Sequence, residues 1–309
     1  MKAFRTTDEV PPDFGPSVVT IGNFDGVHTG HREILRRVAT IASERSLIPV
    51  VLTFDPHPAR VLAPDRAPKL ITTINQRLRR MEKEGVEAAL LLPFSLELAR
   101  LSPDEFAQTV LAETLHARVV IVGDDFRFGH KQAGDIATLR SLGERFGFEV
   151  ESAGAILRRG ERISSTSIRK LIEAGEVSRA CRKLGAPFAL EGNVVKGQGI
   201  GKKQTVPTLN LAPENELLPQ TGVYVTRTTE GDRSWRSVTN VGYRPTFNGQ
   251  DLTIETFLLD PLEGETPGQI EVSFLYYIRD EKKFDTPEQL REQILKDVKF
   301  ANRLHHRLR

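Results

Sequence analysis

The feature that most constrains the fold is a short segment near the start of the chain, where a strand pattern changes to a helix pattern across a glycine-bearing turn. Residues 18–21 are a run of apolar and β-branched side chains, which is typical of a buried strand. Residues 32–39 have the apolar spacing of a helix. The turn from Gly22 to His31 reads Gly-Asn-Phe-Asp-Gly-Val-His-Thr-Gly-His. A strand, a short turn and a helix form half of a βα unit, and such units build parallel sheets.

The same turn is a predicted anion site. Unpaired backbone N–H groups and the helix dipole both face the space in front of a helix N-terminus. Gly30 allows the backbone to approach a phosphate closely, and His28 and His31 would donate hydrogen bonds beside it. This layout suits stabilisation of negative charge better than nucleophilic attack. The plainer alternative, in which both histidines are ordinary polar residues of a loop and a first helical turn, stays open on this pattern alone.

Length and composition limit the classes of protein. A chain of 309 residues is long enough for two domains, and 39% apolar and 27% charged residues are typical of a soluble globular protein. A net charge of +2 favours neither a nucleic-acid nor a membrane partner. Cys181 is the only cysteine, so the chain has no intrachain disulfide and no cysteine-based zinc cluster.

The expected cellular location is based on the absence of targeting and membrane-spanning segments from this sequence. The first residues contain no apolar signal region, and no stretch reaches membrane-spanning length. We therefore expect a cytoplasmic protein. We expect it to be a monomer or a weak homo-oligomer.

Residues 1–186 alternate short apolar runs with amphipathic stretches, which predicts an α/β domain with a doubly wound, Rossmann-like parallel sheet. The predicted strands span residues 17–22, 47–54, 88–94, 118–123 and 148–156. Ser102-Pro-Asp-Glu105 has the form of a capping box, so we expect a helix from there through Leu115.

Residues 187–309 have a different pattern, in which several short strand-like segments are separated by turns. This pattern predicts a small antiparallel β-barrel. The predicted strands span residues 188–196, 223–229, 234–241, 252–259 and 269–276. A long helix capped by Thr286 closes the chain. Its predicted apolar stripe consists of Leu290, Ile294, Val298, Ala301 and Leu304.

Three polar loops of the first domain each follow a predicted strand: the 22–31 turn, the loop at His57 and residues 123–129. Ligands of open parallel sheets bind at the carboxyl ends of the strands, so we expect these loops to meet at one crevice. Ser164, Ser165 and Thr166 stand before a predicted helix, where their hydroxyls can cap it or donate to phosphate. Arg169, one turn further, would add a charged contact. Capping alone is an equal alternative.

Together these motifs resemble the FAD synthetase module of bacterial bifunctional riboflavin kinase/FAD synthetases. The segments that carry the resemblance are 22–31, Thr53-Phe-Asp-Pro-His-Pro58, 123–129 with Gly134-Asp135, and 163–169. The resemblance implies that the phosphate of FMN attacks the α-phosphorus of ATP and releases pyrophosphate, with no general base.

The resemblance also implies roles for individual residues. His28, His31 and Arg169 would neutralise the phosphates, helped by the backbone of Gly30 and the hydroxyls of residues 164–166. Gly22, Asn23 and Asp25 would shape the nucleotide turn. The flavin-binding candidates are His57, Asp125, Phe126 and Arg127.

The second domain contains three further polar features. Gly197, Gly199, Gly201 and Lys202 form a glycine turn that does not fit a Walker A motif, and a surface turn is an equal alternative. Thr208 and Asn210 offer hard oxygen donors suited to Mg²⁺, although a simple turn explains them too. Glu255 shares a strand face with Phe257 and Leu259, where desolvation would raise its pKa and make it a base. A solvent-exposed glutamate at a sheet edge is the alternative.

These features, with Asn240-Val-Gly242, Arg244-Pro-Thr-Phe247 and Arg279-Asp-Glu-Lys-Lys-Phe284, resemble the riboflavin kinase module of the same family over residues 187–309. The resemblance implies that Glu255 activates the ribityl 5′-hydroxyl for attack on the γ-phosphate of ATP. Thr208 and Asn210 would hold Mg²⁺, the 197–203 turn would cover the phosphates, and Arg244 and Arg279 would lie near the flavin. Thr205 and Leu209 depart from the usual family pattern.

The leading hypothesis is one enzyme that converts riboflavin to FMN and then to FAD, using ATP twice. Two alternatives remain: a riboflavin kinase with a degenerate first domain, and a flavin-binding regulator without turnover. The first domain alone also admits another acceptor, such as pantetheine phosphate or nicotinamide mononucleotide.

Overall fold

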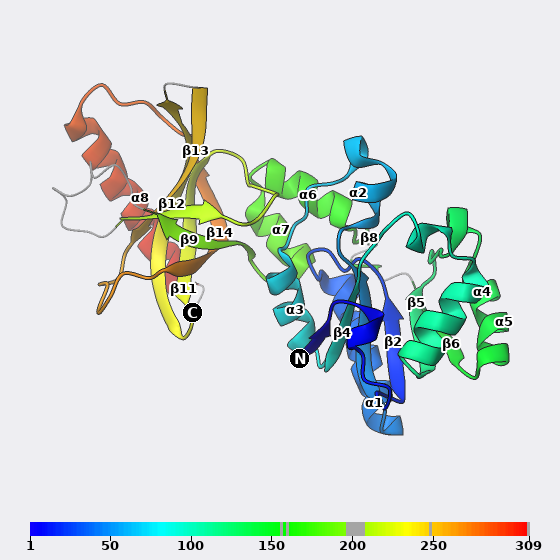
Figure 1. The fold of residues 1–309 in the computed structure, drawn as a ribbon. Coiled ribbons are helices and arrows are strands. Elements are labelled where there is room, and N and C mark those ends of the chain that lie inside the picture. Colours follow the sequence, from blue (N-terminus) through cyan, green and yellow to red (C-terminus); the bar gives the residue numbers. More distant parts are fainter. Residues whose placement is uncertain (155–156, 159–160, 196–207, 247–248, 308–309) are drawn as a thin grey trace. The chain divides into compact units, whose positions relative to one another are not determined.

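The computed structural model describes the chain except for residues 155–156, 159–160, 196–207, 247–248 and 308–309. The chain packs into two compact units (Figure 1). The first contains residues 1–69 and 74–164, and the second contains residues 70–73 and 165–309. Two helices, α6 (Ser165–Glu173) and α7 (Val177–Leu184), therefore pack with the second unit. The functional boundary near residue 186 stays a prediction, and it differs from the division between the packing units at residues 164 and 165.

The first unit is built on a six-stranded parallel sheet with the order β1-β4-β3-β2-β5-β6. Its strands are β1 (Lys2–Phe4), β2 (Ser17–Ile21), β3 (Ile48–Phe54), β4 (Ala88–Leu92), β5 (Ala117–Gly123) and β6 (Glu149–Ala153). The two strands β2 and β4 are buried along their whole length, as expected where helices cover both faces of a sheet. The predicted α/β class is confirmed, with the short edge strand β1 added to the five strands that the sequence predicts.

The first unit also contains helices and shorter elements, most of which connect these strands. They are η1 (Thr7–Glu9), α1 (Thr29–Arg45), α2 (Pro58–Leu62), η2 (Pro64–Arg66), α3 (Ile74–Glu82), η3 (Leu98–Arg100), α4 (Pro103–Phe106), η4 (Ala107–Thr114), η5 (His130–Gln132), α5 (Ile136–Phe146), β7 (Leu157–Arg158) and β8 (Glu161–Arg162). On α1, the apolar residues Val38, Ile41 and Ala42 pack against strands β2 and β5. This packing fixes the helix whose N-terminus forms the predicted anion site.

The predicted capping box is present at the start of α4. The Ser102 hydroxyl accepts a hydrogen bond from the backbone N–H of Glu105 at 3.1 Å, and the Glu105 carboxylate accepts from the backbone N–H of Ser102 at 2.8 Å. The helix then continues as the π-helical segment η4, where the Thr114 hydroxyl donates to the carbonyl oxygen of Thr109. The sequence predicts the helix and its start, but not this wider turn.

The second unit contains a closed antiparallel barrel with the order β10-β13-β12-β11-β14-β9. Its strands are β9 (Phe188–Val195), β10 (Thr208–Pro213), β11 (Gly222–Glu230), β12 (Arg233–Thr246), β13 (Gly249–Leu258) and β14 (Gln269–Arg279). The predicted barrel is confirmed. Strand β10 is not among the predicted strands, because its asparagine and its terminal proline are typical of turns.

The barrel interior includes a chain of buried hydroxyl groups. In order of contact it runs Thr228, Ser237, Thr226, Thr239 and Thr256, with neighbouring oxygens 2.8–2.9 Å apart. All five residues are fully buried. Each hydroxyl has at least one partner, which offsets the free-energy cost of removing it from water.

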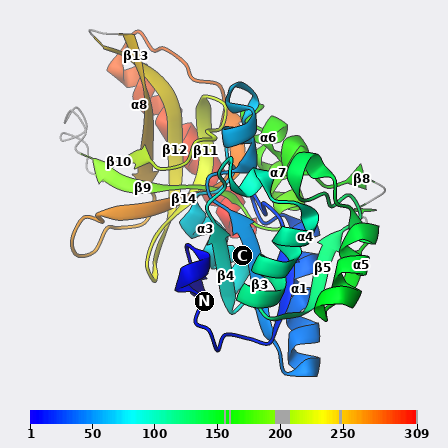
Figure 2. The ribbon, with the colours of Figure 1, turned by 45° about the vertical axis from the view of Figure 1, so that its right-hand side comes forward.

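The closing helix α8 (Pro287–Arg307) lies along the outside of the barrel (Figures 1 and 2). Its start is as predicted, because the Thr286 hydroxyl accepts from the backbone N–H of Gln289 at 3.3 Å. Ala301 and Leu304 of the predicted stripe pack against the barrel. No helix among the residues described is both long and apolar enough to cross a membrane.

Ile294 and Val298 of the predicted stripe are half-buried, but Leu290 needs a correction. Leu290 is 41% exposed, whereas two polar residues of α8, Asp297 and His305, are buried. Asp297 is held by the guanidinium of Arg279 on β14, at 2.8 Å. The apolar spacing alone does not reveal this buried ion pair, because its partner lies on another element.

Candidate functional sites

The first site is the turn between β2 and α1, at the carboxyl end of the sheet. Strand β2 lies between β3 and β5, so the turn that follows it is central on this edge. Phe24 and Val27 have φ values of 48° and 44°, a left-handed conformation that is costly for residues other than glycine. Hydrogen bonds hold the turn: Gly22 donates to the carbonyl oxygen of Leu52 at 3.1 Å, and Arg80 donates to that of Gly26 at 3.0 Å.

The structure brings His28 and His31 together. His28 is the N-cap of α1, and its Nδ1 accepts a hydrogen bond from the backbone N–H of His31 at 3.2 Å. A neutral His28 therefore carries its proton on Nε2, where it can donate. The two imidazole rings stack with centroids 3.6 Å apart. Nδ1 of His31 is buried and makes no hydrogen bond within the described part of the chain, so it is available to a ligand.

Both histidines are neutral near pH 7 in this environment. Burial lowers the pKa of His28 to about 4, against the smaller opposing effects of a backbone hydrogen bond and the Asp25 carboxylate. The pKa of His31 is lowered well below its usual value by burial, and further by His28 and Arg77. Neutral imidazoles can donate hydrogen bonds to phosphate oxygens, and each would gain charge stabilisation as negative charge develops nearby.

A buried ion pair links this turn to helix α3. Nη2 of Arg77, on α3, lies 4.0 Å from Oδ1 of Asp25, and the two side chains are 1% and 2% exposed. The sequence predicts a role for Asp25 but not for Arg77. Arg77 is one of three arginines between residues 77 and 80, and nothing in the local pattern distinguishes the buried one.

The flavin-binding candidates of the first unit lie on the loops after β3 and β5. These strands flank β2 in a parallel sheet, so all three loops lie along the same edge. His57 is the N-cap of α2, and its Nδ1 accepts from the backbone N–H of Ala59 at 3.1 Å. Phe126 stacks on Phe128 with centroids 5.4 Å apart, whereas Asp125 and Arg127 are exposed. The predicted sharing of one edge agrees with the topology.

The segment that contains the predicted phosphate-binding hydroxyls and Arg169, residues 164–169, is divided between the two units. Ser164 is the last residue of the first unit, and Ser165, Thr166 and Arg169 lie on α6 in the second. Ser165 and Thr166 occupy the first turn of α6, as the capping pattern suggests. Their role at the phosphates of the first site stays a prediction.

The second site is a row of polar residues across three barrel strands. Glu255 on β13 is directly opposite Asn210 on β10 and Asn240 on β12. Directly opposed residues of neighbouring strands share a face of the sheet. Thr208 precedes Asn210 by two residues, so it lies on that face as well, opposite Phe257. The structure therefore brings the three predicted kinase residues, Thr208, Asn210 and Glu255, to one face.

The burial pattern agrees with the predicted alternation along β13. Ile254 and Leu258 are buried, whereas Glu255 is half-buried on the opposite face. Asn240, which completes the polar row, is part of a motif that the sequence singles out but not one of the predicted site residues. Its position opposite Glu255 depends on strand register, which the sequence does not specify.

The structure does not bring the remaining kinase candidates together on this face. The glycine-turn candidates Gly197, Gly199, Gly201 and Lys202, and the departure at Thr205, lie outside the described residues. The second departure, Leu209, is buried, because it alternates with Thr208 and Asn210 along β10. Arg244 lies on β12 with its backbone opposite residue 251. Arg279 ends β14, where it pairs with Asp297 and donates to the carbonyl oxygen of Asp280 at 3.0 Å.

Thr208 and Asn210 suit a metal ion whose other ligands are waters and the phosphates of a substrate. Within the part of the chain that the structure describes, no group of three or more His, Cys, Asp or Glu side chains is arranged to hold a metal ion. A hydroxyl and an amide oxygen, next to Glu255, form an all-oxygen donor set. Mg²⁺ accepts such donors when waters and substrate phosphates complete its coordination.

Comparison with protein families assigns each half of the chain. Residues 11–167 match the family model for FAD synthetase, and residues 184–305 match the model for riboflavin kinase. Curated proteins named bifunctional riboflavin kinase/FMN adenylyltransferase match over most of their length. The protein from Escherichia coli K12 is 35% identical over 281 residues, covering 91% of this chain and 90% of that one. The protein from Pseudomonas fluorescens is 35% identical over 305 residues, covering 98% of each.

A solved structure shares the fold of the whole chain. The crystal structure named macrolide-efflux protein from Streptococcus pneumoniae aligns with a TM-score of 0.86 at 30% identity, over 97% of this chain and 98% of that one. The chain is thus a two-part transferase, with a nucleotidyltransferase half and a kinase half. It belongs to the bifunctional riboflavin kinase/FMN adenylyltransferase family, so the resemblance predicted from the sequence is confirmed.

Proposed function

We propose that the chain phosphorylates riboflavin to FMN at the Glu255 site and adenylylates FMN to FAD at the His28–His31 site. The observation that carries this proposal is that each family-matched half contains its own group of polar residues suited to its reaction. One is a stacked pair of neutral histidines at a helix N-terminus. The other is a carboxylate in register with Asn210 and Asn240.

In the adenylylation step, a phosphate oxygen of FMN forms a bond to the α-phosphorus of ATP, and the bond from that phosphorus to the bridging oxygen breaks. Pyrophosphate leaves. The FMN phosphate is already an anion, so no side chain needs to remove a proton. His28 donates through Nε2, and the N-terminal amides of α1 and the backbone at Gly30 face the same phosphates.

Further contacts complete the proposed first site. Gly22, Asn23 and Asp25 shape the nucleotide turn, and the Asp25–Arg77 pair keeps that turn rigid. Arg169 and the hydroxyls of residues 164–166 bind phosphate oxygens. The flavin lies near His57, Asp125, Phe126 and Arg127.

In the kinase step, the ribityl 5′-hydroxyl oxygen bonds to the γ-phosphorus of ATP while Glu255 accepts its proton, and ADP leaves. Thr208 and Asn210 would hold Mg²⁺, which offsets the negative charge of the phosphates. Lys202 and the glycines at 197, 199 and 201 contact the nucleotide, and Arg244 and Arg279 lie near the flavin.

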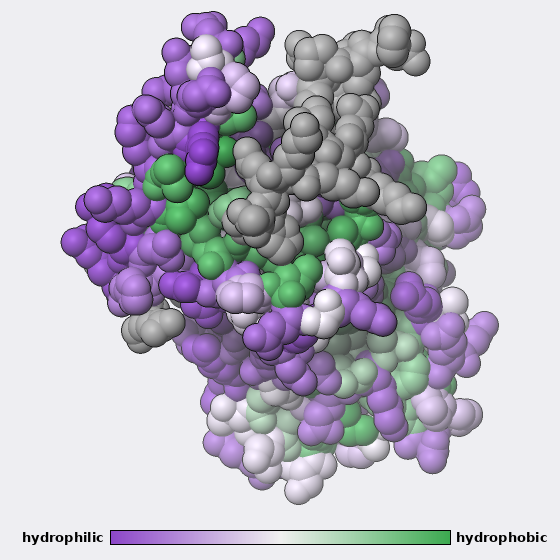
Figure 3. All heavy atoms as spheres, turned by 90° about the vertical axis from the view of Figure 1, so that its left-hand side faces the viewer, coloured by the Kyte–Doolittle hydropathy of each residue, from purple (hydrophilic) through white to green (hydrophobic). Residues whose placement is uncertain are grey.

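A flavin needs an apolar surface for its ring system as well as polar contacts for its chain. Figure 3 shows apolar side chains gathered on one face of the molecule. The exposed large apolar residues of the second unit are Val195, Tyr243, Tyr276, Leu290 and Leu295. Val195 pairs directly with Asn210, so at least one of them adjoins the polar row. This arrangement supports docking of riboflavin on the outer face of the barrel.

The proposal includes no macromolecular partner. Riboflavin, FMN and ATP are the ligands, and neither nucleic acid nor a membrane takes part. The chain acts as a monomer or a weak homo-oligomer. A cytoplasmic location is part of the proposal, since both reactions consume ATP.

A time course of product formation tests the proposal. The purified chain is mixed with riboflavin, ATP and Mg²⁺, and the flavins are separated by chromatography. We expect FMN to appear first and FAD to follow at the expense of FMN. FMN without FAD would contradict the assignment of the first unit. Flavin binding without any product would instead identify a regulator.

A further inference from the structure

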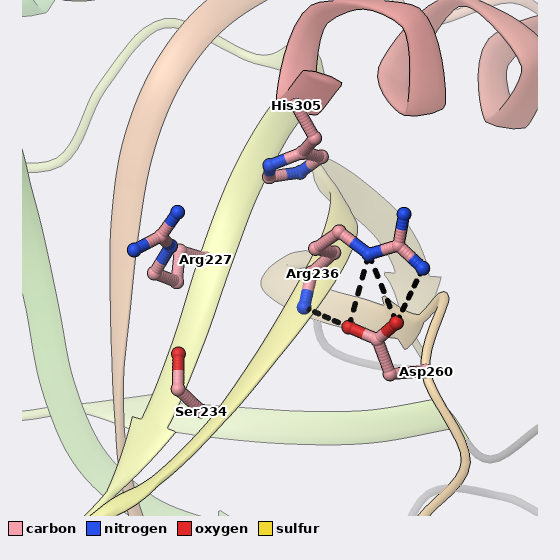
Figure 4. A pocket seen from close by; sticks show the side chains of 5 residues that line it. All are labelled: Arg227, Ser234, Arg236, Asp260 and His305. Carbon is pink, nitrogen blue, oxygen red and sulfur yellow. Dashed lines mark hydrogen bonds and ion pairs between the residues drawn. The ribbon is translucent and has the colours of Figure 1, made fainter. Parts of the chain in front are cut away.

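A cavity outside both proposed catalytic sites lies on the outer surface of the barrel, at the C-terminal end of α8. Its volume is about 190 Å³, and its lining residues are Arg227 on β11, Ser234 and Arg236 on β12, Asp260 after β13, and His305 on α8. Figure 4 shows His305 pointing from the helix into the space between the two arginines. Arg236 is four residues along β12 from Asn240 of the polar row. At the usual rise per residue of a strand, the two residues are roughly 13 Å apart.

His305 is the unusual member of this lining. Its side chain is 2% exposed, and neither ring nitrogen makes a hydrogen bond to any residue that the structure describes. Burial and the neighbouring guanidinium groups of Arg227 and Arg236 lower its pKa, with a smaller opposing effect from the carbonyl groups of Ser237 and Thr226. A buried polar group without a hydrogen bond is costly, so the ring nitrogens call for a ligand or ordered water in the cavity.

The two arginines differ in how their charge is balanced. Arg236 is held rigidly: its Nε lies 2.9 Å from Oδ1 of Asp260, and its Nη1 donates to Asn302 at 3.2 Å. Arg227 is directly opposite Arg236 on the neighbouring strand, and it makes no ion pair within the described ranges of the chain. The Asp260 carboxylate therefore balances the charge of Arg236 but not that of Arg227. Like charges directly opposed across strands are destabilising, and a bound anion would relieve this repulsion.

We propose that this cavity binds a phosphate-class oxyanion. The guanidinium of Arg227, the imidazole of His305 and the hydroxyl of Ser234 reach it from three different elements. Donors from three directions match a tetrahedral anion better than a planar carboxylate. At about 30 Å³ for each water in the liquid, the cavity has room for such an anion and several waters. Two sources share this chemistry: free inorganic phosphate and the pyrophosphate released in FAD formation.

Histidine NMR on the full chain tests the proposal. The ring resonances of His305, in protein labelled at histidine, are followed while inorganic phosphate and, separately, pyrophosphate are added. We expect a saturable shift with at least one of them. A response to inorganic phosphate identifies the free ion as the ligand, and a response to pyrophosphate alone identifies the diphosphate. His28 and His31 report binding at the first site independently. The absence of a saturable His305 shift with either anion would overturn the proposal.

Two substitutions locate the binding. Arg227→Ala should weaken the affinity reported by His305 roughly tenfold to a hundredfold, as loss of a charged hydrogen-bond donor does. Arg303→Ala removes an exposed arginine of α8 that does not line the cavity, and it should leave the affinity unchanged. Equal affinity in the wild-type chain and Arg227→Ala would overturn the proposal. Should Arg227→Ala fail to fold, Arg227→Lys provides the same test, because it keeps the charge but not the guanidinium fork.

Discussion

At the scale of single residues, His28 has two separable roles. Its Nδ1 caps α1, and its Nε2–H is free to donate to a phosphate. Asparagine also caps helices well, so His28→Asn removes the ring donor while it keeps the cap.

We expect His28→Asn to lower the rate of FAD formation from FMN at least about a hundredfold, the usual cost of a lost donor to a developing charge. Riboflavin phosphorylation should not change, because Glu255 and its neighbours lie in the other unit. Both rates can be measured on one preparation, so the kinase rate is the control. An equal loss of both activities would contradict separate sites.

The converse substitution belongs to Glu255. Glu255→Gln keeps the size of the side chain but cannot accept the proton of the ribityl hydroxyl, so FMN formation should fall by at least about a hundredfold. FAD should still form when FMN is supplied. Glu263→Gln, at an exposed position of the same unit, is the matched control and should keep full kinase activity. Normal kinase turnover in Glu255→Gln would exclude this residue as the base.

At the scale of elements, the attachment of α8 to the barrel depends on a polar contact as well as on packing. The Asp297 carboxylate is buried and accepts from Nε and Nη2 of Arg279. Gln293, one helical turn earlier, donates to the same carboxylate at 2.9 Å. Removal of one partner from such a pair leaves the other charge buried and uncompensated.

Asp297→Ala should therefore lower the free energy of unfolding of the second unit by about 3–5 kcal/mol. Glu292→Ala removes an exposed carboxylate from the same helix and should change it by less than about 0.5 kcal/mol. Urea unfolding followed by tryptophan fluorescence measures both, because Trp235 on β12 is the only tryptophan in the chain. Equal stability of the two variants would show that the ion pair does not hold α8.

Local signals explain how much of the fold the sequence predicts. The Ser102–Glu105 capping box, the Thr286 cap and the buried strand before Gly22 each depend on residues within one or two turns, and the structure has all three. Strand β1 is too short to give a pattern. Strand β10 is stabilised by pairing with β9 and β13 rather than by its own composition.

The site residues that the sequence misses share one property: each depends on a partner far away in the chain. Arg77 is distinguished from its neighbouring arginines by its burial next to Asp25. Asn240 is part of the polar row because the strand register places it opposite Glu255. His305 looks like one of several basic residues at a helix end, and only the folded barrel buries it.

At the scale of the whole molecule, the chain does not pass from one unit to the other only once. Residues 70–73 belong to the second unit although they precede most of the first unit's sequence. The backbone N–H of Leu70 donates to the Glu216 carboxylate at 3.0 Å, and the Thr73 hydroxyl donates to the Glu191 carboxylate on β9. A fragment that starts at residue 165 would lack these contacts.

A substitution in this early segment should therefore weaken the kinase half. Thr73→Val removes a hydroxyl donor from Glu191, a buried carboxylate, at a cost of about 1–3 kcal/mol. We expect kinase activity to be lost at a lower temperature than in the unsubstituted chain. Thr6→Val, at an exposed position, is the control. A lower temperature for FAD formation alone would contradict the assignment of residues 70–73 to the second unit.

The hydroxyl chain inside the barrel also limits the order in which this protein can evolve. Thr226 lies in the middle of the chain and has two partners, whereas Thr228 and Thr256 lie at its ends and have one each. Valine at Thr226, Thr228 or Thr256 leaves each remaining hydroxyl with a partner, whereas valine at Ser237 or Thr239 leaves the hydroxyl at the end of the chain with none. A lineage can therefore replace these hydroxyls by hydrocarbon in small steps only if Ser237 changes after Thr228 and Thr239 changes after Thr256, so mutational history at these positions should be directional.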